Sequence, residues 1–384
     1  MNLAFKQTQT GVSIFSVMTA LAQEYGALNM AQGFPDFDCD PLLLQLAHTY
    51  MSNAKLQQYA PMPGVLSLRE AVSRIYSTEY KAQFSAEHEI TITAGGTQAL
   101  YTAFSALLEP GDEVILFEPA YDSYAPAIYL QGAKPVGIPL LPPFFEIDWD
   151  LVNRSIGPKT KAILINNPHN PTGKVWSESD LNQISALALK HRLYVIADEV
   201  YEHMVFDGLQ HHSIAGRKEL RECCVLIGSF GKTLHATGWK IGTLSACKSL
   251  TRIMRQVHQF QVFAVNHPLQ HAIADYLSEP SRYQNIKGFY ENRRNMFLKA
   301  LDTQRWQALP CQGTYFQLLD YSACSNLPDT QLAEILVKKH GIACIPVSVF
   351  YSQNPKPQLL RICFAKSDAT LFRAAECLNA VQGL

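Results

Sequence analysis

The sequence has no long apolar run and almost no net charge. None of its apolar stretches approaches the roughly 18 residues that a membrane-spanning helix needs. The 32 basic and 33 acidic side chains leave a formal net charge of -1 over 384 residues. This balance gives no electrostatic reason to expect a nucleic acid or an anionic membrane as partner. We therefore expect no membrane contact and no nucleic-acid partner, and we expect local charges to bind any anionic ligand.

The sequence also lacks a C-x-x-C pair, and its nine cysteines follow no spacing typical of zinc sites. An odd number of scattered cysteines is typical of reduced and mostly buried thiols. These observations predict a cytoplasmic protein without a bound metal. The glycine pattern G-x-G-x-x-G is missing as well, which disfavours a nicotinamide dinucleotide as cofactor.

What the sequence does contain is an alternation of β-rich and helical segments. Its 47% hydrophobic and 17% charged residues are typical of a folded protein, and its length suits two domains. The alternation predicts an α/β domain with a mostly parallel central sheet flanked by helices. The expected strands are residues 89–93, 113–117, 161–166, 193–197 and 224–228, and the expected helices are residues 97–108 and 177–191.

The part of the chain after about residue 280 has a different pattern. Helical segments at 283–302 and 371–381 flank short strands near 313–319 and 359–364. This arrangement predicts a smaller α+β domain that also includes the N-terminal segment. We therefore predict a large domain over residues 46–280 and a small domain formed by residues 1–45 and 281–384.

Several polar residues follow the expected strands, where ligands bind in an open α/β sheet. A glycine pair, Gly95-Gly96, opens a helix whose N-terminal N–H groups suit a phosphate, although such a pair also occurs in plain turns. Asp198 ends one strand and Tyr201 follows it, and the next strand leads to Lys232. An acid, a phenol and a lysine on adjacent strand ends predict a site for one flat, polar cofactor.

Five motifs occur along the chain in a fixed order. They are G-F-P-D-F (33–37), N-P-H-N-P-T-G (167–173), D-E-V-Y (198–201), S-F-G-K (229–232) and G-W-K-I-G (238–242). Taken together, they resemble the class I aminotransferases, which have fold type I and depend on pyridoxal 5′-phosphate. The resemblance covers residues 14–365, nearly the whole chain. The longer motif G-K-T-x-x-A-T-G-W-K-I-G is most similar to the branch of methionine and kynurenine/glutamine aminotransferases.

The resemblance implies catalytic and cofactor-binding roles around the pyridine ring. Lys232 would bind the cofactor aldehyde as a Schiff base and serve as general base. Asp198 would pair with the pyridine nitrogen and keep it protonated. Tyr201 and Asn170 would donate hydrogen bonds to the phenolate oxygen, and the ring of Tyr121 would stack on the pyridine face.

The resemblance also implies a phosphate site that two subunits share. Within one chain, the phosphate ligands would be Gly96, Thr97, Gln98, Ser229 and Lys240. Many members have an arginine in place of Lys240, and a lysine is a point charge without the bidentate fork. Tyr59 matches a tyrosine that reaches the phosphate of the neighbouring subunit in relatives, so we expect a homodimer with shared active sites.

The resemblance places the substrate near the small domain. Arg361 would bind the α-carboxylate, with Asn170 and Gly33 beside it. Ile14 and Phe15 would line the pocket for the substrate side chain. The stretch where aspartate-type relatives carry a second arginine has Asn266-His267 here, which favours neutral amino acids.

We therefore predict a pyridoxal-phosphate-dependent aminotransferase that moves the amino group of a neutral amino acid, such as methionine or an aromatic one, to a 2-oxo acid. A β-eliminating C–S lyase of the same fold is an alternative, because it would use the same Lys232 and Asp198. A non-catalytic domain of a transcription regulator is a third possibility, but the segment before Gly33 is expected to be too short for a DNA-binding domain. Formation of a keto product without ammonia would distinguish these functions.

Overall fold

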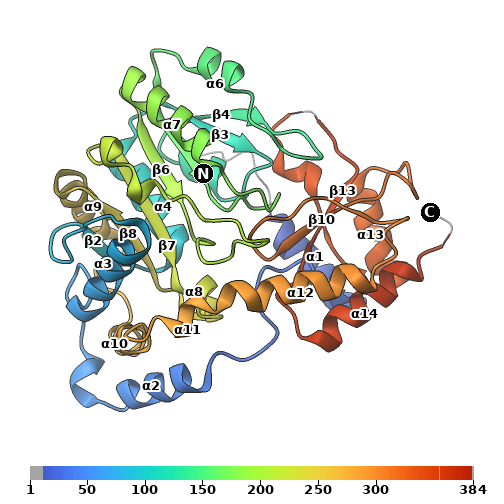
Figure 1. The fold of residues 1–384 in the computed structure, drawn as a ribbon, viewed down its shortest axis with the longest axis horizontal. Coiled ribbons are helices and arrows are strands. Elements are labelled where there is room, and N and C mark those ends of the chain that lie inside the picture. The colour runs from blue at the N-terminus through green and yellow to red at the C-terminus, as the bar shows by residue number, and fades with distance from the viewer. Residues whose placement is uncertain (1–11, 354, 383–384) are drawn as a thin grey trace, which may run out of the picture.

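A seven-stranded sheet forms the centre of the larger part of the molecule in the computed structural model, which describes residues 12–353 and 355–382 (Figure 1). The spatial order is β2-β8-β7-β6-β5-β3-β4. Strand β8 runs opposite to the other six strands, which all run in the same direction. This arrangement confirms the mostly parallel sheet. The strands are β2 (Ile90–Thr93), β3 (Glu113–Glu118), β4 (Lys134–Pro139), β5 (Thr160–Asn166), β6 (Tyr194–Asp198), β7 (Cys224–Ser229) and β8 (Gly242–Ala246).

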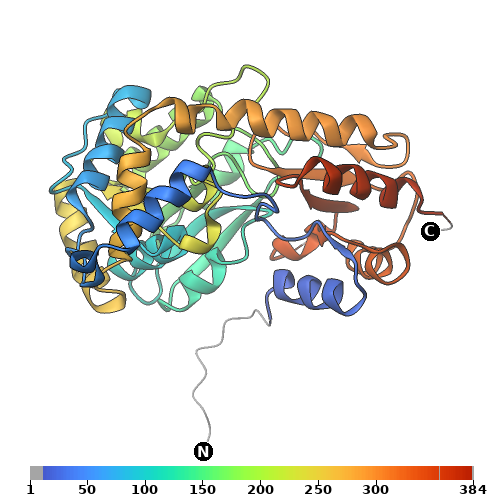
Figure 2. The ribbon, with the colours of Figure 1, turned by 90° about the horizontal axis from the view of Figure 1, so that it is seen from below.

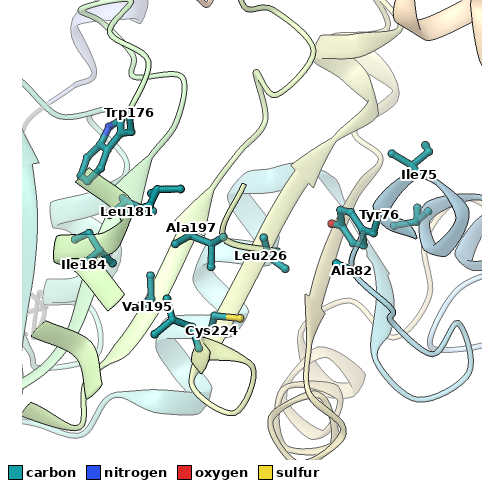
Figure 3. Close-up of a cluster of buried hydrophobic side chains, with 14 of the residues drawn as sticks. Ile75, Tyr76, Ala82, Trp176, Leu181, Ile184, Val195, Ala197, Cys224 and Leu226 are labelled. Atoms are coloured by element: carbon teal, nitrogen blue, oxygen red, sulfur yellow. The ribbon is translucent and has the colours of Figure 1, made fainter. Parts of the chain in front are cut away.

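Helices cover both faces of this sheet, as its alternating side chains require. On β6, Val195 and Ala197 belong to one apolar core and Ile196 to another. Because successive side chains of a strand point to opposite faces, a strand that is buried on both sides reads as a continuous apolar run. Figure 3 shows the core on one of these faces, where side chains of β6 and β7 lie in one cluster with Trp176, Leu181, Ile184, Ile75 and Tyr76.

Two sets of helices supply these cores. The first core contains residues of α2 (Pro41–Met51), α3 (Leu66–Tyr80), α6 (Trp149–Ser155), α7 (Glu178–His191) and α10 (His267–Tyr276). The second contains residues of α4 (Gly95–Leu107), α5 (Tyr124–Tyr129) and α9 (Lys248–Gln261). The capping box expected at the start of α7 is present, since Ser177 and Asp180 exchange side-chain and backbone hydrogen bonds.

A smaller part of the molecule lies beside the part with the large sheet (Figure 2). Its buried apolar side chains form a core of their own. Its four-stranded antiparallel sheet has the order β12-β13-β10-β9, and β1 pairs with β11 beside it. The strands are β1 (Leu28–Asn29), β9 (Gln307–Ala308), β10 (Phe316–Asp320), β11 (Ile342–Ala343), β12 (Ile345–Pro346) and β13 (Leu359–Cys363). The helices are α1 (Ile14–Glu24), α12 (Ile286–Ala300), α13 (Asp329–His340) and α14 (Asp368–Asn379).

Short helices connect the larger elements. They are α8 (Phe230–Thr233), α11 (Ser281–Gln284), η1 (Ala54–Gln57), η2 (Ile214–Gly216), η3 (Lys218–Leu220), η4 (Thr237–Trp239) and η5 (Val347–Phe350). The long helix α12 runs from the larger part to the smaller one in both views (Figures 1 and 2). Within the described residues, every helix is too short or too polar to span a lipid bilayer.

The division into a large and a small domain remains a proposal, and two packing contacts bear on its boundaries. The predicted boundary after residue 45 falls inside α2, whose Leu43 is buried in the core of the larger part. Tyr283, just after the second predicted boundary, is buried in that core too. We propose boundaries before α2 and after α11, because each helix then stays with the core that it packs against.

Candidate active site

The carboxyl ends of three parallel strands meet at one edge of the large sheet. Asn166, the last residue of β5, pairs with Asp198, the last residue of β6. Asp198 in turn pairs with Ile227, and β7 continues through Ser229 directly into α8, which carries Lys232. A cavity of about 270 Å³ lies at these ends and is bounded on another side by Gly95 at the start of α4. This is the edge where ligands bind in open α/β sheets.

Most of the side chains that the sequence predicts for the site line this cavity. They are Phe15, Gly33, Gly96, Thr97, Tyr121, Asn170, Asp198, Tyr201, Ser229, Lys232, Lys240 and Arg361. They come from the N-terminal segment, from the ends of the five strands β2, β3, β5, β6 and β7, from the stretch before β8 and from the small sheet. The structure therefore brings together residues up to 346 positions apart in the chain.

Three predicted site residues lie outside the lining of the cavity. The Gln98 side chain turns away from it and donates a hydrogen bond to Thr102 Oγ1 at 2.5 Å. Ile14 lines an adjacent groove. Tyr59 is 81% exposed, and its ring packs against that of Phe263, with ring centroids 5.3 Å apart. Within one protomer, Gln98 can thus contribute only its backbone N–H, and Tyr59 contributes nothing to this cavity.

Lys232 lies deep in the cavity with its amine held by two oxygen atoms. Its Nζ donates to Tyr315 Oη at 2.7 Å and points toward the Gly33 carbonyl oxygen at 3.4 Å. Burial lowers the pKa of Lys232 to about 8, with the Arg361 and Lys240 charges acting in the same direction. About a tenth of this amine is therefore unprotonated at pH 7, far more than for a lysine with the ordinary pKa of 10.5. A nucleophile or base requires this neutral form.

Asp198 is a buried carboxylate with few partners. Its Oδ2 accepts a hydrogen bond from the Tyr124 hydroxyl at 2.7 Å, and its Oδ1 accepts one from the Val200 N–H at 3.3 Å. Burial raises the pKa of Asp198 to about 6, although the Tyr124 hydrogen bond opposes this shift. A buried carboxylate in such a site is suited to pair with a cationic group of a ligand.

The start of α4 forms a cationic corner of the cavity. Gly95 has φ of +77°, and a Cβ at this position would lie 3.3 Å from Lys240 Nζ. The ammonium of Lys240 thus lies against the first residue of the helix, where free backbone N–H groups and the helix dipole favour an anion. With the Ser229 side chain also in the lining, this corner has the donors that a phosphate needs.

Arg361, on β13, is fully buried and only partly hydrogen-bonded. Its Nη1 donates to Asn170 Oδ1 at 3.0 Å and its Nη2 to the Ala31 carbonyl oxygen at 2.9 Å. The Phe316 ring lies 3.9 Å from the guanidinium carbon. Among the described residues, Arg361 Nε finds no acceptor. Because Arg361 lines the cavity and a buried charge needs an anionic partner, the arrangement fits a ligand carboxylate in the cavity.

These groups fit pyridoxal phosphate. The cationic corner at α4 suits its phosphate, the buried Asp198 suits its ring nitrogen, and the Lys232 amine with its lowered pKa suits its aldehyde. The Tyr121 ring borders the same space. Arg361, which also lines the cavity, supplies a positive charge for a substrate carboxylate.

The sequence interpretation missed several residues at the site. Tyr124 bonds to Asp198, and Tyr315 bonds to Lys232. Leu100, Asn166 and Phe316 line the cavity. Tyr124 follows Tyr121 by three residues, so its closeness to that predicted site residue could have indicated a place in the site. Tyr315 gives no such signal, because an aromatic residue beside a strand is typical of a core.

Comparisons with known proteins agree with this geometry. The sequence model of a family described as "Aminotransferase class I and II" matches residues 26–378. The chain is 45% identical over 377 residues to the methionine aminotransferase of Escherichia coli K12, covering 97% of each chain. It is 34% identical over 388 residues to kynurenine–oxoglutarate transaminase 1 of Mus musculus, covering 92% of this chain and 91% of that one.

A solved structure extends the comparison to the fold. The crystal structure of YbdL from Escherichia coli, identified as a methionine aminotransferase, superimposes with a TM-score of 0.96 at 43% identity, covering 99% of this chain and 100% of that one. The family match, the relatives and the cavity agree, and the chain belongs to the class I and II aminotransferases, enzymes that use pyridoxal phosphate to transfer amino groups.

Proposed function

We propose that this transaminase takes the amino group from a neutral, largely apolar amino acid, such as methionine or an aromatic one, and passes it to a 2-oxo acid. The charge of the cavity carries this proposal. Among the described residues of its lining, the cationic side chains are Lys232, Lys240 and Arg361. The two lysines face the cofactor, and Arg361 serves the α-carboxylate common to all amino acids. Among the described lining residues, no cation is then left for a second carboxylate.

The surroundings of Arg361 support an apolar substrate side chain. The rings of Phe15 and Phe316 lie 4.8 Å and 3.9 Å from its guanidinium carbon. A substrate whose carboxylate is bound by Arg361 would therefore have aromatic surfaces beside it, and Ile14 lines the adjoining groove. The relatives named for methionine and kynurenine are consistent with such substrates. We propose that Asn170 and the backbone of Gly33 complete the carboxylate site.

Lys232 is the proposed catalytic base. When bound, pyridoxal phosphate supplies an aldehyde that accepts an amino group and a ring that withdraws electrons from the substrate Cα. Lys232 would hold that aldehyde until the substrate amine replaces it. Its Nζ, freed and unprotonated, would then take the proton from the substrate Cα and pass it on to the cofactor. The pKa of about 8 keeps the amine available for both roles.

Residues around Lys232 would orient and polarise the cofactor ring. Asp198 would keep the ring nitrogen protonated, and the Tyr124 hydrogen bond would fix the direction of its carboxylate. Burial raises the pKa of Tyr201 far above its usual range, so its hydroxyl remains a donor for the phenolate oxygen. Asn170 uses its Oδ1 for Arg361, which leaves its NH₂ group to donate to the same oxygen. Tyr121 would stack on the ring.

The cationic corner would bind the phosphate. We propose as its ligands the backbone N–H groups of Gly96, Thr97 and Gln98, the Ser229 hydroxyl and the Lys240 ammonium. The left-handed backbone of Lys240, with φ of +53°, directs the chain so that its amine lies against Gly95. A lysine here attracts the phosphate as a point charge, so the backbone N–H groups must set the orientation.

We also propose a cytoplasmic homodimer with shared active sites. Exposed aromatic side chains support a partner surface, since Phe260 is 85% and Tyr59 81% exposed, and Phe263 packs against Tyr59. His267 joins the same region through its Nδ1, 3.0 Å from the Gln58 carbonyl oxygen. A second copy would cover these rings and would place its Tyr59 at the phosphate of this one. The nine cysteines are all free thiols, in keeping with the cytoplasm.

Replacement of Lys232 tests the proposed function. Lys232→Ala should lose at least about a thousandfold in turnover, because one side chain supplies both the aldehyde ligand and the base. The measurement is keto-acid formation from methionine and phenylalanine with a 2-oxo acid acceptor, together with an ammonia assay. Lys338→Ala, a change on the surface of α13, serves as control. Near-normal turnover of Lys232→Ala, or ammonia in proportion to product, would refute the proposal.

A further inference from the structure

Tyr315 contacts the Lys232 amine but does not line the cavity. Its hydroxyl accepts the hydrogen bond from Lys232 Nζ at 2.7 Å and donates its own to the Gly33 carbonyl oxygen at 2.6 Å. Nζ and the Gly33 oxygen are 3.4 Å apart. The three groups thus form a closed triangle of polar atoms at the edge of the cavity, since Gly33 and Lys232 line it and Tyr315 does not.

The Tyr315 ring has little freedom to move. It is fully buried and packs edge-on against Tyr201, with centroids 5.3 Å apart, and against Phe316 at 4.8 Å. Tyr290 packs on another side at 5.6 Å. Burial also raises the pKa of Tyr315 well above its usual range, so the group remains a hydroxyl at any working pH. A fixed, neutral hydroxyl is a suitable anchor for an amine.

The triangle joins chain segments that meet only in the folded protein. Tyr315 belongs to the core of the smaller part, and Gly33 lies in the N-terminal segment, whereas Lys232 follows β7 of the large sheet. Gly33 can take no side chain here, because a Cβ would lie 2.8 Å from the Phe316 ring. The anchor therefore exists only while the two parts are packed together.

We infer that Tyr315 is a positioning residue that holds the Lys232 amine whenever Lys232 is not joined to the cofactor. An amine on a flexible four-carbon chain can turn in many directions, and proton transfer needs one of them. The Tyr315 hydroxyl restricts the amine to one place without touching cofactor or substrate. This inference rests on the proposed role of Lys232 as base.

The pKa of the Lys232 amine depends on all the charged and polar groups around it, including the Tyr315 hydroxyl. They are Asp198 on β6, Lys240 after η4, Arg361 and Cys363 on β13, the Tyr201 ring, and the triangle itself. Tyr315→Phe removes one acceptor and leaves all the others in place. Because an ammonium gains more from an acceptor than a neutral amine does, the pKa of Lys232 should fall in this variant.

The test compares Tyr315→Phe with Tyr290→Phe in full-length protein freed of cofactor. Tyr290→Phe is a matched control, because it also removes a hydroxyl from a buried tyrosine that packs against Tyr315. The Tyr290 hydroxyl, however, has no hydrogen-bond partner among the described residues. Acetic anhydride labelling at a series of pH values, read by mass spectrometry of the Lys232 peptide, gives the pKa of this amine. We expect wild type and Tyr290→Phe near 8 and Tyr315→Phe lower by about half to one unit.

A second readout uses the loaded enzyme. With a donor deuterated at Cα, Tyr315→Phe should lower kcat by about tenfold, raise the isotope effect on kcat and leave KM nearly unchanged, because proton transfer alone suffers. Identical labelling curves for wild type and Tyr315→Phe, or equal shifts in both variants, would overturn the inference. If the wild-type enzyme itself showed no transamination, that result would reject the proposed function rather than the role of Tyr315.

A variant that keeps the shape of the residue protects the test if Tyr315→Phe fails to fold. Incorporation of 3,5-difluorotyrosine at position 315 retains the hydroxyl but weakens it as an acceptor. The labelling curve of Lys232 should then shift in the same direction by a smaller amount. An unshifted curve would also overturn the inference.

Discussion

At the residue scale, burial changes two ionisable groups in a way that prepares the site for its cofactor. It lowers the pKa of Lys232 to about 8 and raises that of Asp198 to about 6. Both shifts disfavour the charged form. For Lys232 the result is a usable base. For Asp198 it is a cost, which a protonated ring nitrogen would offset.

The difference in folding stability between Asp198→Asn and wild type should therefore depend on pH. Since the folded state binds the Asp198 proton more tightly than the unfolded state, the stability from this carboxyl is fully present below the ordinary value of 3.8 and is lost as the pH rises through about 6. Between pH 4 and pH 8 this loss amounts to about 3 kcal/mol at most. Cofactor-free Asp198→Asn should thus gain stability relative to wild type as the pH rises.

Urea unfolding of both cofactor-free proteins at pH 4 and pH 8 measures this difference. In the loaded enzyme the same change should slow turnover by about a hundredfold or more, because the ring nitrogen loses its charged partner. A stability difference that is the same at both pH values would contradict the assigned pKa of Asp198.

Arg361→Lys should affect all amino donors alike. The planar guanidinium presents several donors in a fixed fork, whereas an ammonium offers one point charge. KM should rise by about tenfold or more for each donor, by a similar factor, because all donors share the α-carboxylate. Steady-state kinetics with methionine, phenylalanine and leucine gives the comparison. An increase confined to one donor would instead assign Arg361 to side-chain specificity.

At the element scale, strand β8 positions the cationic corner, the proposed phosphate site. Gly242 begins this strand and pairs with Thr93 on one side and Ser229 on the other. A Cβ at Gly242 would lie 2.7 Å from the Gly228 oxygen and 2.9 Å from the Gly96 nitrogen. These are backbone atoms, which cannot turn away as a side chain can. The start of α4 is therefore held against β8 by close backbone packing.

Gly242→Ala should displace the start of α4 and weaken binding of the cofactor phosphate. We expect a loss of about 1–3 kcal/mol in stability from the forced backbone shift, together with a measurable fall in cofactor retention during dialysis. Gly288→Ala, in α12 with open space around its Cβ, should instead be neutral or stabilise by up to about 1 kcal/mol. Full cofactor retention by Gly242→Ala would argue against this role of β8.

At the scale of the whole molecule, the proposed dimer decides whether Tyr59 functions. Tyr59 is largely exposed within one protomer and lies outside the cavity. If it reaches the phosphate in the partner, Tyr59→Phe should weaken cofactor binding by about 1–2 kcal/mol, as for loss of a hydrogen bond to a charged group. Cofactor titration by fluorescence or absorbance measures this change.

Subunit mixing provides a sharper test of the shared site. Tyr59→Ala and Lys232→Ala are mixed at a cofactor concentration that leaves Tyr59→Ala mostly empty. Each mixed dimer then has one site with both lesions and one intact site, so an equal mixture should recover about a quarter of wild-type activity after exchange. Exchange is followed with differently tagged chains. Demonstrated exchange without recovered activity would place Tyr59 in the site of its own subunit.

The sequence by itself determined the fold class and most of the site. Apolar runs such as residues 193–197 predicted buried strands. When both faces of a strand are buried, the side chains on both faces are apolar and the sequence does not alternate with polar residues. The motifs around Asp198, Lys232 and Arg361 predicted the chemistry through their resemblance to the class I aminotransferases. The positions of Asp198 and Lys232 after adjacent strands agree with that prediction, because ligands bind at this edge of an open sheet. Segments such as β4 and β8 were not predicted, since Lys134–Pro139 and Gly242–Ala246 contain proline or glycine and lack a clear period.

Only the tertiary structure decided which other side chains surround the reacting groups. Tyr124 reaches Asp198 from α5 and Tyr315 reaches Lys232 from the smaller core, across 74 and 83 residues of chain. No local pattern encodes such contacts, because they depend on how two separately packed cores meet. The pKa values of Lys232 and Asp198 follow from the same packing, since burial rather than sequence neighbours dominates both shifts.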